Sequence, residues 1–148
     1  MLPDPSSLAA LQARPDVTEM VTRGVCRILL NEGCAVLTEF TLANGRRADV
    51  VGLCPKGIIT IVEVKSCRAD FEVDAKWQDY LDYCDRFFFA VDECFPREIL
   101  PDEEGLMIAD GFGGATLRPT VDRKLAAGRR KAVTLRFARQ AAFAATGR

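Results

Sequence analysis

The stretch that most constrains the fold is Arg46–Ser66, in which two strand-like runs flank a Cys-Pro-Lys-Gly turn. Its second run holds five consecutive apolar or β-branched residues, Ile58–Val62, a pattern typical of a strand buried on both faces. Asp49 opens the first run, and Glu63 and Lys65 close the second. Because side chains alternate along a strand, Glu63 and Lys65 share one face, and a hairpin can bring Asp49 beside them. The sequence therefore predicts two carboxylates and one ammonium close together.

The length of 148 residues predicts a single domain over residues 1–148. A chain of this size can bury about 70% of its unfolded surface, so neither a metal nor a disulfide is needed for folding. No apolar run is long enough to span a membrane, and residues 1–14 lack the charged start and apolar stretch of a signal peptide. We therefore expect a leader over residues 1–14, a cytoplasmic location and no membrane association.

The chain contains no histidine, which excludes Ser-His and Cys-His triads, histidine bases and the common zinc sites that contain histidine. Carboxylate, lysine, tyrosine and hard-metal chemistry remain. The six cysteines form no Cys-x-x-Cys pair, and four of them lie in apolar runs. They are Cys26, Cys34, Cys54, Cys67, Cys84 and Cys94. We expect buried thiols rather than zinc ligands or disulfides.

The net charge of -1 hides a strong asymmetry along the chain. Residues 1–117 contain 11 Lys and Arg against 20 Asp and Glu, whereas residues 118–148 contain 9 against 1. Such a division indicates either an internal electrostatic complement or a basic segment that binds a polyanion. The acidic body by itself does not resemble a nucleic-acid-binding domain.

The pattern of apolar residues and turn residues predicts an α/β fold with the order αβββαβ, then a small C-terminal β pair and a basic helix. The first expected elements are a helix over 16–32 that Gly33 ends and three strands over 34–41, 46–53 and 57–65, with an Asn44-Gly45 turn between the first two strands. A helix from Ser66 or Asp70 to near Cys84 and a parallel strand over 86–91 follow. The last expected elements are a helical turn over 96–100, strands over 105–109 and 115–118, and a helix over 128–146. The three first strands form an antiparallel meander.

The C-terminal helix, basic over residues 129–146, combines an apolar stripe with a separate basic ridge. The stripe consists of Val133, Phe137, Ala141 and Ala144, and the ridge consists of Arg129, Arg136 and Arg139. The ridge is a candidate nucleic-acid-binding surface.

Asp49 and Glu63 at the ends of adjacent strands can jointly hold Mg²⁺ or Mn²⁺, because hard cations prefer oxygen ligands. The main-chain carbonyl of Val64 is a natural further ligand. A cation at this place lowers the pKa of bound water, and the Lys65 ammonium can orient the nucleophile or offset negative charge. The chemistry is that of a phosphodiester hydrolase. A Glu-x-Lys pair on its own is often only a solvated ion pair.

With these residues in this order, Val17–Val91 resembles the PD-(D/E)XK nuclease superfamily, which has a restriction-endonuclease-like αβββαβ core and a mixed sheet flanked by helices. Asp49 matches the second-strand aspartate, and Glu63 and Lys65 match the motif on the third strand. Ala48 stands where the motif has proline, a departure that superfamily members commonly show. The runs VLTEFTLANGRRADVVGL, VEVKSCRADFEVDAKWQDYLDYCDRFFFAV and GLMIAD are similar to the MmcB family of predicted DNA repair proteins. The resemblance implies metal-dependent cleavage or binding of DNA.

The resemblance also points to residues around this motif. Glu39, near the end of the first strand, is either a supplementary metal ligand or a solvent-facing residue. Gln78 fits the place where some superfamily nucleases carry a helix glutamine or lysine facing the site, and Lys76 competes for that role.

Four further residues are candidates for DNA contacts. Arg46 and Arg47 lie beside Asp49, but a regular strand allows only one of them to face the site and a phosphate. Trp77 and Tyr80 favour core positions, with base stacking as the alternative if they are exposed.

Three hypotheses remain open at this point. The first is a Mg²⁺-dependent deoxyribonuclease in DNA repair, and the second is a catalytically inactive DNA-binding or scaffold module on the same fold. The third is a structural domain whose basic helix packs on its own acidic surface. DNA and other repair proteins are the expected partners. A symmetric homodimer that places two sites on one duplex is compatible with the apolar turn around Phe112.

Overall fold

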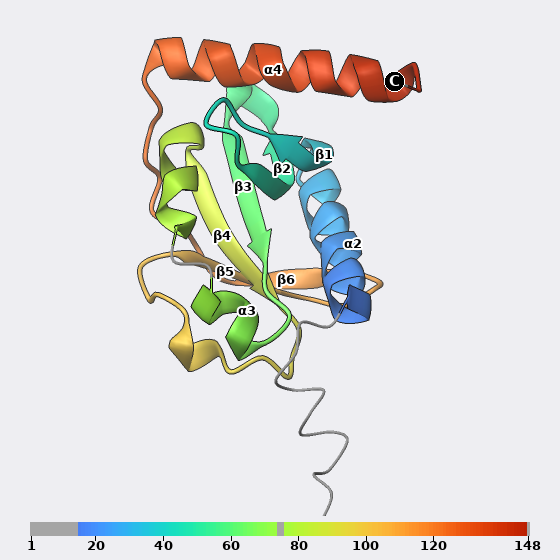
Figure 1. Cartoon of the computed structure of the whole chain (residues 1–148), viewed down its shortest axis with the longest axis vertical. Coiled ribbons are helices and arrows are strands. Elements are labelled where there is room, and N and C mark those ends of the chain that lie inside the picture. The colour runs from blue at the N-terminus through green and yellow to red at the C-terminus, as the bar shows by residue number, and fades with distance from the viewer. Residues whose placement is uncertain (1–14, 74–75, 148) are drawn as a thin grey trace, which may run out of the picture.

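The computed structural model describes residues 15–73 and 76–147, and the predicted leader over 1–14 lies outside them. The chain is an α/β protein with a six-stranded mixed sheet flanked by helices (Figure 1). Its helices are α2 (Pro15–Asn31), α3 (Arg68–Val73) and α4 (Ala127–Ala145), and its 3₁₀ turns are η1 (Pro55–Gly57), η2 (Trp77–Tyr83) and η3 (Arg97–Ile99). Its strands are β1 (Ala35–Thr41), β2 (Arg47–Leu53), β3 (Ile59–Val64), β4 (Arg86–Val91), β5 (Gly105–Ala109) and β6 (Gly114–Arg118).

The strands lie side by side in chain order, β1 to β6. The pairs β1–β2, β2–β3 and β5–β6 are antiparallel, and β3–β4 and β4–β5 are parallel. The predicted meander and the parallel β4 are confirmed. The predicted C-terminal β pair is confirmed as β5 and β6. Strand β5 also pairs with β4, from Phe88↔Gly105 to Val91↔Ile108, and so joins this pair to the main sheet.

Glycines close the two turns that the sequence marked. Gly33 adopts a φ of 84° after α2, and the Cys34 N–H donates to Leu29 O at 3.0 Å, which ends the helix as expected. Gly45, with a φ of 86°, closes the β1–β2 hairpin, where the Arg46 N–H donates to Asn44 Oδ1 at 2.9 Å.

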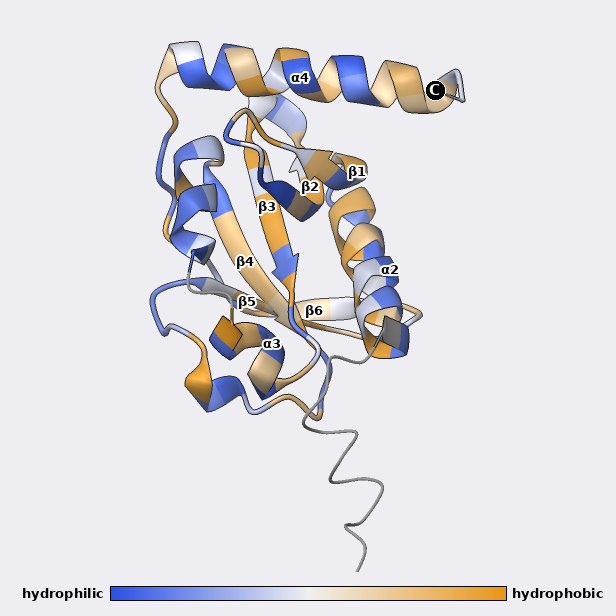
Figure 2. Cartoon of the chain, in the orientation of Figure 1, coloured by the Kyte–Doolittle hydropathy of each residue, from blue (hydrophilic) through white to orange (hydrophobic). Residues whose placement is uncertain are grey.

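The sheet has an apolar core on each face. The valines and leucine of α2 cover one face, and α3, η2 and α4 cover the other around Phe87 and Phe89. Figure 2 shows apolar residues along most of β3 and β4, the central strands. All six residues of β3 are buried, as the run Ile58–Val62 predicted.

The second predicted helix, from Ser66 or Asp70 to near Cys84, is wrong as a single element, because the structure divides it into α3 and η2. Lys76, with φ −126° and ψ 22°, is not helical, and the Asp79 N–H donates to Lys76 O three residues back. A three-residue repeat places Trp77 and Tyr80 on one side, where both rings stack on Phe87 at 5.8 and 6.1 Å between centroids. Aromatic packing therefore favours the tighter helix.

Helix α4 crosses the end of the sheet beside the β1–β2 hairpin (Figure 1). Val133 and Phe137 are buried as predicted, whereas Ala144 is exposed and does not belong to the packed stripe. The Gln140 amide holds the β1 edge, because it donates to Thr41 O at 2.8 Å and accepts from the Thr41 N–H at 3.2 Å. The side chain thereby caps an edge strand that would otherwise present free main-chain groups.

The basic C-terminal segment pairs with the acidic body, as the internal-complement interpretation proposed. Arg130 Nη1 lies 2.7 Å from Asp85 Oδ2, and Arg123 Nη2 lies 2.9 Å from Glu104 Oε1. Both carboxylates are buried. Two of the cations in this segment therefore compensate buried negative charges of the body.

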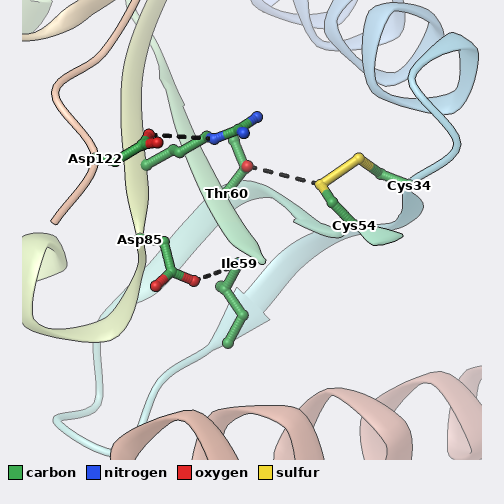
Figure 3. Close-up of a disulfide and its surroundings, with 7 residues drawn as sticks. Cys34, Cys54, Ile59, Thr60, Asp85 and Asp122 are labelled. Carbon is green, nitrogen blue, oxygen red and sulfur yellow. Dashed lines mark hydrogen bonds and ion pairs between the residues drawn. A yellow bond between two sulfur atoms is a disulfide. The ribbon is translucent and has the colours of Figure 1, made fainter. Parts of the chain in front are cut away.

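The cysteine prediction holds for only part of the set. Cys67 and Cys84 are buried thiols, but Cys94 is exposed, and Cys34 and Cys54 form a disulfide (Figure 3). The correction follows from the pairing of β1 with β2, because Ala35 lies opposite Leu53 and the next residues outward are the two cysteines. None of the described helices is long and apolar enough to cross a membrane.

Candidate active site

Asp49 and Glu63 face each other where the β2–β3 ladder ends. The last paired residues are Val50 and Val62. One step further, the Asp49 N–H donates to Glu63 Oε1 at 3.0 Å, and the Val64 N–H donates to Asp49 Oδ2 at 2.8 Å. Each carboxylate thus replaces a main-chain acceptor of the ladder, and both are fixed at the strand ends.

Lys65 lies at the same end of β3. Its N–H donates to Ala90 O at 3.0 Å, which continues the β3–β4 pairing one residue beyond the strand. Strand alternation then keeps its side chain on the face of Glu63. Both side chains are buried, with relative exposures of 5% for Lys65 and 4% for Glu63. The structure therefore brings together the two carboxylates and the ammonium.

Burial raises the pKa of Asp49 above the ordinary aspartate value. The hydrogen bond from Val64, the charge of Lys65 and the contact with Glu63 lower the pKa and offset part of that increase. The nearby negative charge of Asp70 raises it further. Ionised Asp49 therefore costs free energy in the folded chain, and an added cation would lower that cost.

Asp70 is a neighbour of the site that sequence reasoning treated only as the start of a helix. It lies in the first turn of α3, and its Oδ2 accepts the Ser66 N–H at 3.0 Å. A short loop thus returns this carboxylate toward Asp49. The capping pattern in the sequence indicated the helix start but not this approach.

Tyr80 is a second neighbour that sequence reasoning assigned to the core. Its side chain is buried, so base stacking is not open to it, and its hydroxyl donates to Arg47 O at 3.1 Å. Burial and the charges of Glu63 and Asp49 raise the pKa of Tyr80 to about 12. The hydroxyl therefore stays protonated and holds the start of β2. The signal in the sequence for a residue at this place was the three-residue spacing of Trp77 and Tyr80 after the Glu-x-Lys motif.

Three other predicted site residues, Glu39, Gln78 and Lys76, are exposed. Glu39 is exposed, with a φ of 54°, and it lies between the β1–β2 pairs Thr38↔Val50 and Phe40↔Ala48. Gln78 and Lys76 are exposed at the start of η2. Their catalytic and metal-binding roles stay predictions.

Two of the predicted DNA-binding arginines contact residues of η2. Arg46 Nε lies 3.2 Å from Asp79 Oδ2, and its guanidinium lies 5.7 Å from the centre of the Tyr80 ring. Arg129 of α4 lies 4.4 Å from the centre of the Tyr83 ring. These two arginines therefore flank the same turn.

The other basic candidates lie on α4 and β2. Arg129 and Arg136 line a hollow of about 360 Å³ together with Tyr83 and the hairpin residues Leu42 and Ala43. Arg139 is exposed, with its guanidinium 5.4 Å from the Phe143 ring centre, and Arg47 is exposed at the start of β2. Arg129 and Arg136 thus form the part of the predicted ridge that faces η2.

Two carboxylates of the site, those of Asp49 and Glu63, are the candidates for holding a divalent cation. Asp49 lies close enough to Glu63, Asp70 and Lys65 for all three to shift its pKa, and Glu63 and Lys65 are buried. Within residues 15–73 and 76–147, no three Cys, Asp or Glu side chains are grouped closely enough to hold a metal ion. The protein donors would therefore be the Asp49 and Glu63 pair, with water completing the coordination.

Comparisons with known proteins give the family of this chain. The family model described as DNA repair protein MmcB-like matches residues 7–146. The chain belongs to the MmcB-like family. A solved structure titled SPO1766 protein of unknown function, from Silicibacter pomeroyi, is 49% identical to this MmcB-like chain, with a TM-score of 0.82 over 85% of this chain and 86% of that one. No curated protein matches. Family membership indicates a role in DNA repair.

Proposed function

We propose that this MmcB-like protein is a metal-dependent deoxyribonuclease that acts in DNA repair on a PD-(D/E)XK, restriction-endonuclease-like core. The observation that carries the proposal is a pair of hydrogen bonds, from the Asp49 N–H to Glu63 Oε1 and from the Val64 N–H to Asp49 Oδ2, which fixes two carboxylates at adjacent strand ends. The order α2, β1–β3, α3 and β4, with β3 and β4 parallel, supports the same assignment.

Asp49 and Glu63 would hold the cation, Mg²⁺ or Mn²⁺. Such an ion supplies water activation and charge neutralisation on a phosphate oxygen. Lys65 contributes an ammonium on the Glu63 face, where it offsets negative charge that develops on the phosphate. Tyr80 keeps its proton and positions the start of β2 through the Arg47 carbonyl. The chain thus supplies binding groups, a fixed cation and a rigid support.

The arginines beside η2 give the DNA backbone a path to this site. Arg46, Arg129 and Arg136 lie around η2, and cationic side chains bind phosphates without regard to sequence. Arg47 and Arg139 are exposed and add positive charge to the surface. Because the body is acidic overall, this strip would determine where DNA can approach.

A cleavage assay tests the nuclease. Purified protein and a Lys65→Ala variant are incubated with single-stranded, duplex and branched DNA in Mg²⁺ or Mn²⁺. We expect Lys65→Ala to reduce the rate by about 10²–10³-fold, the cost of removing one preorganised electrostatic group. Arg23→Ala is the matched control, because Arg23 lies exposed on α2 and pairs only with the exposed Glu19 among the described residues. Equal rates for wild type and Lys65→Ala would contradict the assignment.

A catalytically inactive DNA-binding or scaffold module is the second candidate. It is favoured by the arginines on α4, which can bind DNA without any contribution from the carboxylates. In that case no substrate is cleaved, and DNA affinity falls in an Arg136→Glu, Arg139→Glu double variant but not in Asp49→Ala. A fluorescence anisotropy titration separates the two candidates.

A further inference from the structure

A groove of about 680 Å³ runs along the flank of α4 that faces away from Arg129 and Arg136. Its walls are mainly apolar and come from α4 and from the segment that precedes it. Leu125, Ala127, Leu135 and Ala138 are apolar wall residues, and Lys124 and Lys131 are basic ones. Leu135 is 59% exposed. An apolar side chain of this size at a concave surface is a feature of binding sites.

Lysines surround this apolar surface, and the two acidic residues of the adjoining hollow, Asp85 and Asp122, pair with Arg130 and Arg86 instead. An adjoining hollow of about 390 Å³ shares Lys124 with the groove and adds Lys56. Among the described residues, neither a hydrogen bond nor an ion pair is formed by the side chains of Lys56, Lys124 and Lys131. Arg130 differs, because Asp85 neutralises it. Three positive charges are thus available at the rim.

The backbone at Lys56 adds an independent observation. Lys56 adopts φ 68° and ψ 10°, the left-handed region that favours glycine, and Gly57 after it also has a positive φ of 80°. A lysine at this position strains the turn, and among the described residues its side chain forms no hydrogen bond or ion pair that would offset the strain. Such strain commonly accompanies a functional side chain.

We propose that this groove binds an acidic amphipathic peptide segment of a partner protein. The apolar side chains of the segment would cover Leu125 and Leu135, and its carboxylates would pair with Lys56, Lys124 and Lys131. DNA fits the groove less well, because phosphates could pair with the lysines but would leave the apolar surface uncovered. The site is separate from the arginines beside η2, so a partner and DNA can bind at the same time.

Peptide binding tests the proposal. The probe is a fluorescein-labelled synthetic peptide that alternates Asp with Leu and Phe, titrated by anisotropy. One comparison peptide has Ser in place of Leu and Phe, and another has Lys in place of Asp. We expect only the first peptide to bind, and we expect added salt to weaken its binding because the lysines face solvent. No binding of the first peptide, or equal binding of all three, overturns the proposal.

Variants assign the binding to the groove. We expect Leu135→Glu and Lys131→Glu each to weaken binding by about tenfold, as loss of an apolar anchor or of a rim charge does. Lys56→Gly should weaken binding while raising the Tm, because it relieves the left-handed strain, so misfolding cannot explain the loss. The control is Arg97→Glu, an equal charge change on exposed η3.

Two other outcomes also overturn the proposal. If single-stranded DNA displaces the peptide and Leu135→Glu has no effect, the surface is a phosphate site. If sedimentation shows a dimer that Leu135→Glu dissociates, the occupant is a second copy of the chain. Because the readout is peptide binding, the result is independent of whether the protein cleaves DNA.

Discussion

Asp49 and Glu63 each accept a hydrogen bond from the strand that carries the other, Asp49 from the Val64 N–H at 2.8 Å and Glu63 from the Asp49 N–H at 3.0 Å. The two carboxylates thereby continue the β2–β3 pairing at the point where the main-chain ladder ends. Because the same atoms support the sheet and form the candidate metal site, substitutions here change stability and function together.

The pH dependence of Asp49 is the first prediction. Burial raises the pKa of Asp49 in the folded chain above its value in the unfolded chain. Protonated Asp49 therefore stabilises the fold at a pH below the unfolded pKa, and this stabilisation is lost as the pH rises through the higher pKa of the folded chain. Asp49→Asn removes the charge and keeps an oxygen for the Val64 N–H. We expect a higher Tm than wild type at neutral pH without cations, and a flatter dependence of Tm on pH.

The response of this variant to cations is the accompanying control. Mg²⁺ or Mn²⁺ should raise the Tm of wild type, because a ligand that binds only the folded state stabilises it. The Tm of Asp49→Asn should not change. A lower Tm for Asp49→Asn in the absence of cations would show that the ionised carboxylate stabilises the fold and would contradict the argument.

Asp85 provides the second prediction. Burial alone raises its pKa, but hydrogen bonds from Arg130 and from the Ile59 and Leu125 N–H groups lower the pKa to about 2 (the Ile59 bond is shown in Figure 3). Its contribution to stability is complete above the unfolded aspartate pKa of about 4 and is lost as the pH falls through about 2. Acid denaturation followed by circular dichroism should show a loss of about 2 kcal/mol over this window.

Removing the partner of Asp85 should lower the free energy of unfolding more than protonation of Asp85 does. Arg130→Ala leaves a buried carboxylate without its cation, and we expect a loss of about 3–5 kcal/mol at neutral pH, measured by urea unfolding. The exposed neighbour Lys131, changed to Ala, should alter stability by less than about 0.5 kcal/mol. Similar losses for the two variants would show that the ion pair does not hold α4 against the sheet.

The contact between α2 and the β5–β6 turn is the third prediction. A Cβ on Gly24 would lie 2.7 Å from Gly113 O and 2.8 Å from the Ala109 Cβ, with no flexible group to yield. We expect Gly24→Ala to destabilise the fold by about 1–3 kcal/mol. Gly128→Ala, in α4 with open space around it, is the matched control and should stabilise the fold by up to about 1 kcal/mol. Thermal unfolding of both variants measures the difference.

The disulfide is the fourth prediction. Alkylation of the denatured, unreduced protein should modify four thiols, and prior reduction should increase that number to six. Reduction removes a cross-link between residues 20 positions apart and should lower the free energy of unfolding by about 3 kcal/mol. Cys34→Ser should reproduce this loss and make the protein insensitive to reductant. Six reactive thiols without reduction would contradict the pairing.

Local signals in the sequence were sufficient for most of the secondary structure. Gly33 and the Asn44-Gly45 turn ended the elements where expected, because the left-handed backbone at these points is a property of the residue itself. The alternation of side chains also placed Glu63 and Lys65 on one face. The second helix was mispredicted because the three-residue repeat of its aromatic residues depends on Phe87, which is supplied by another strand.

The sequence by itself determined the antiparallel meander, the buried run of β3 and the approach of Asp49 to Glu63, since these depend on short-range periodicity and tight turns. Only the tertiary structure decided the Cys34–Cys54 bond, the attachment of β5 to β4, the hydrogen bond of Tyr80 to the Arg47 carbonyl and the pairing of Arg130 with Asp85. Each of these contacts joins residues far apart in the chain. Their partners are selected by strand register and by packing across the sheet, which no local pattern encodes.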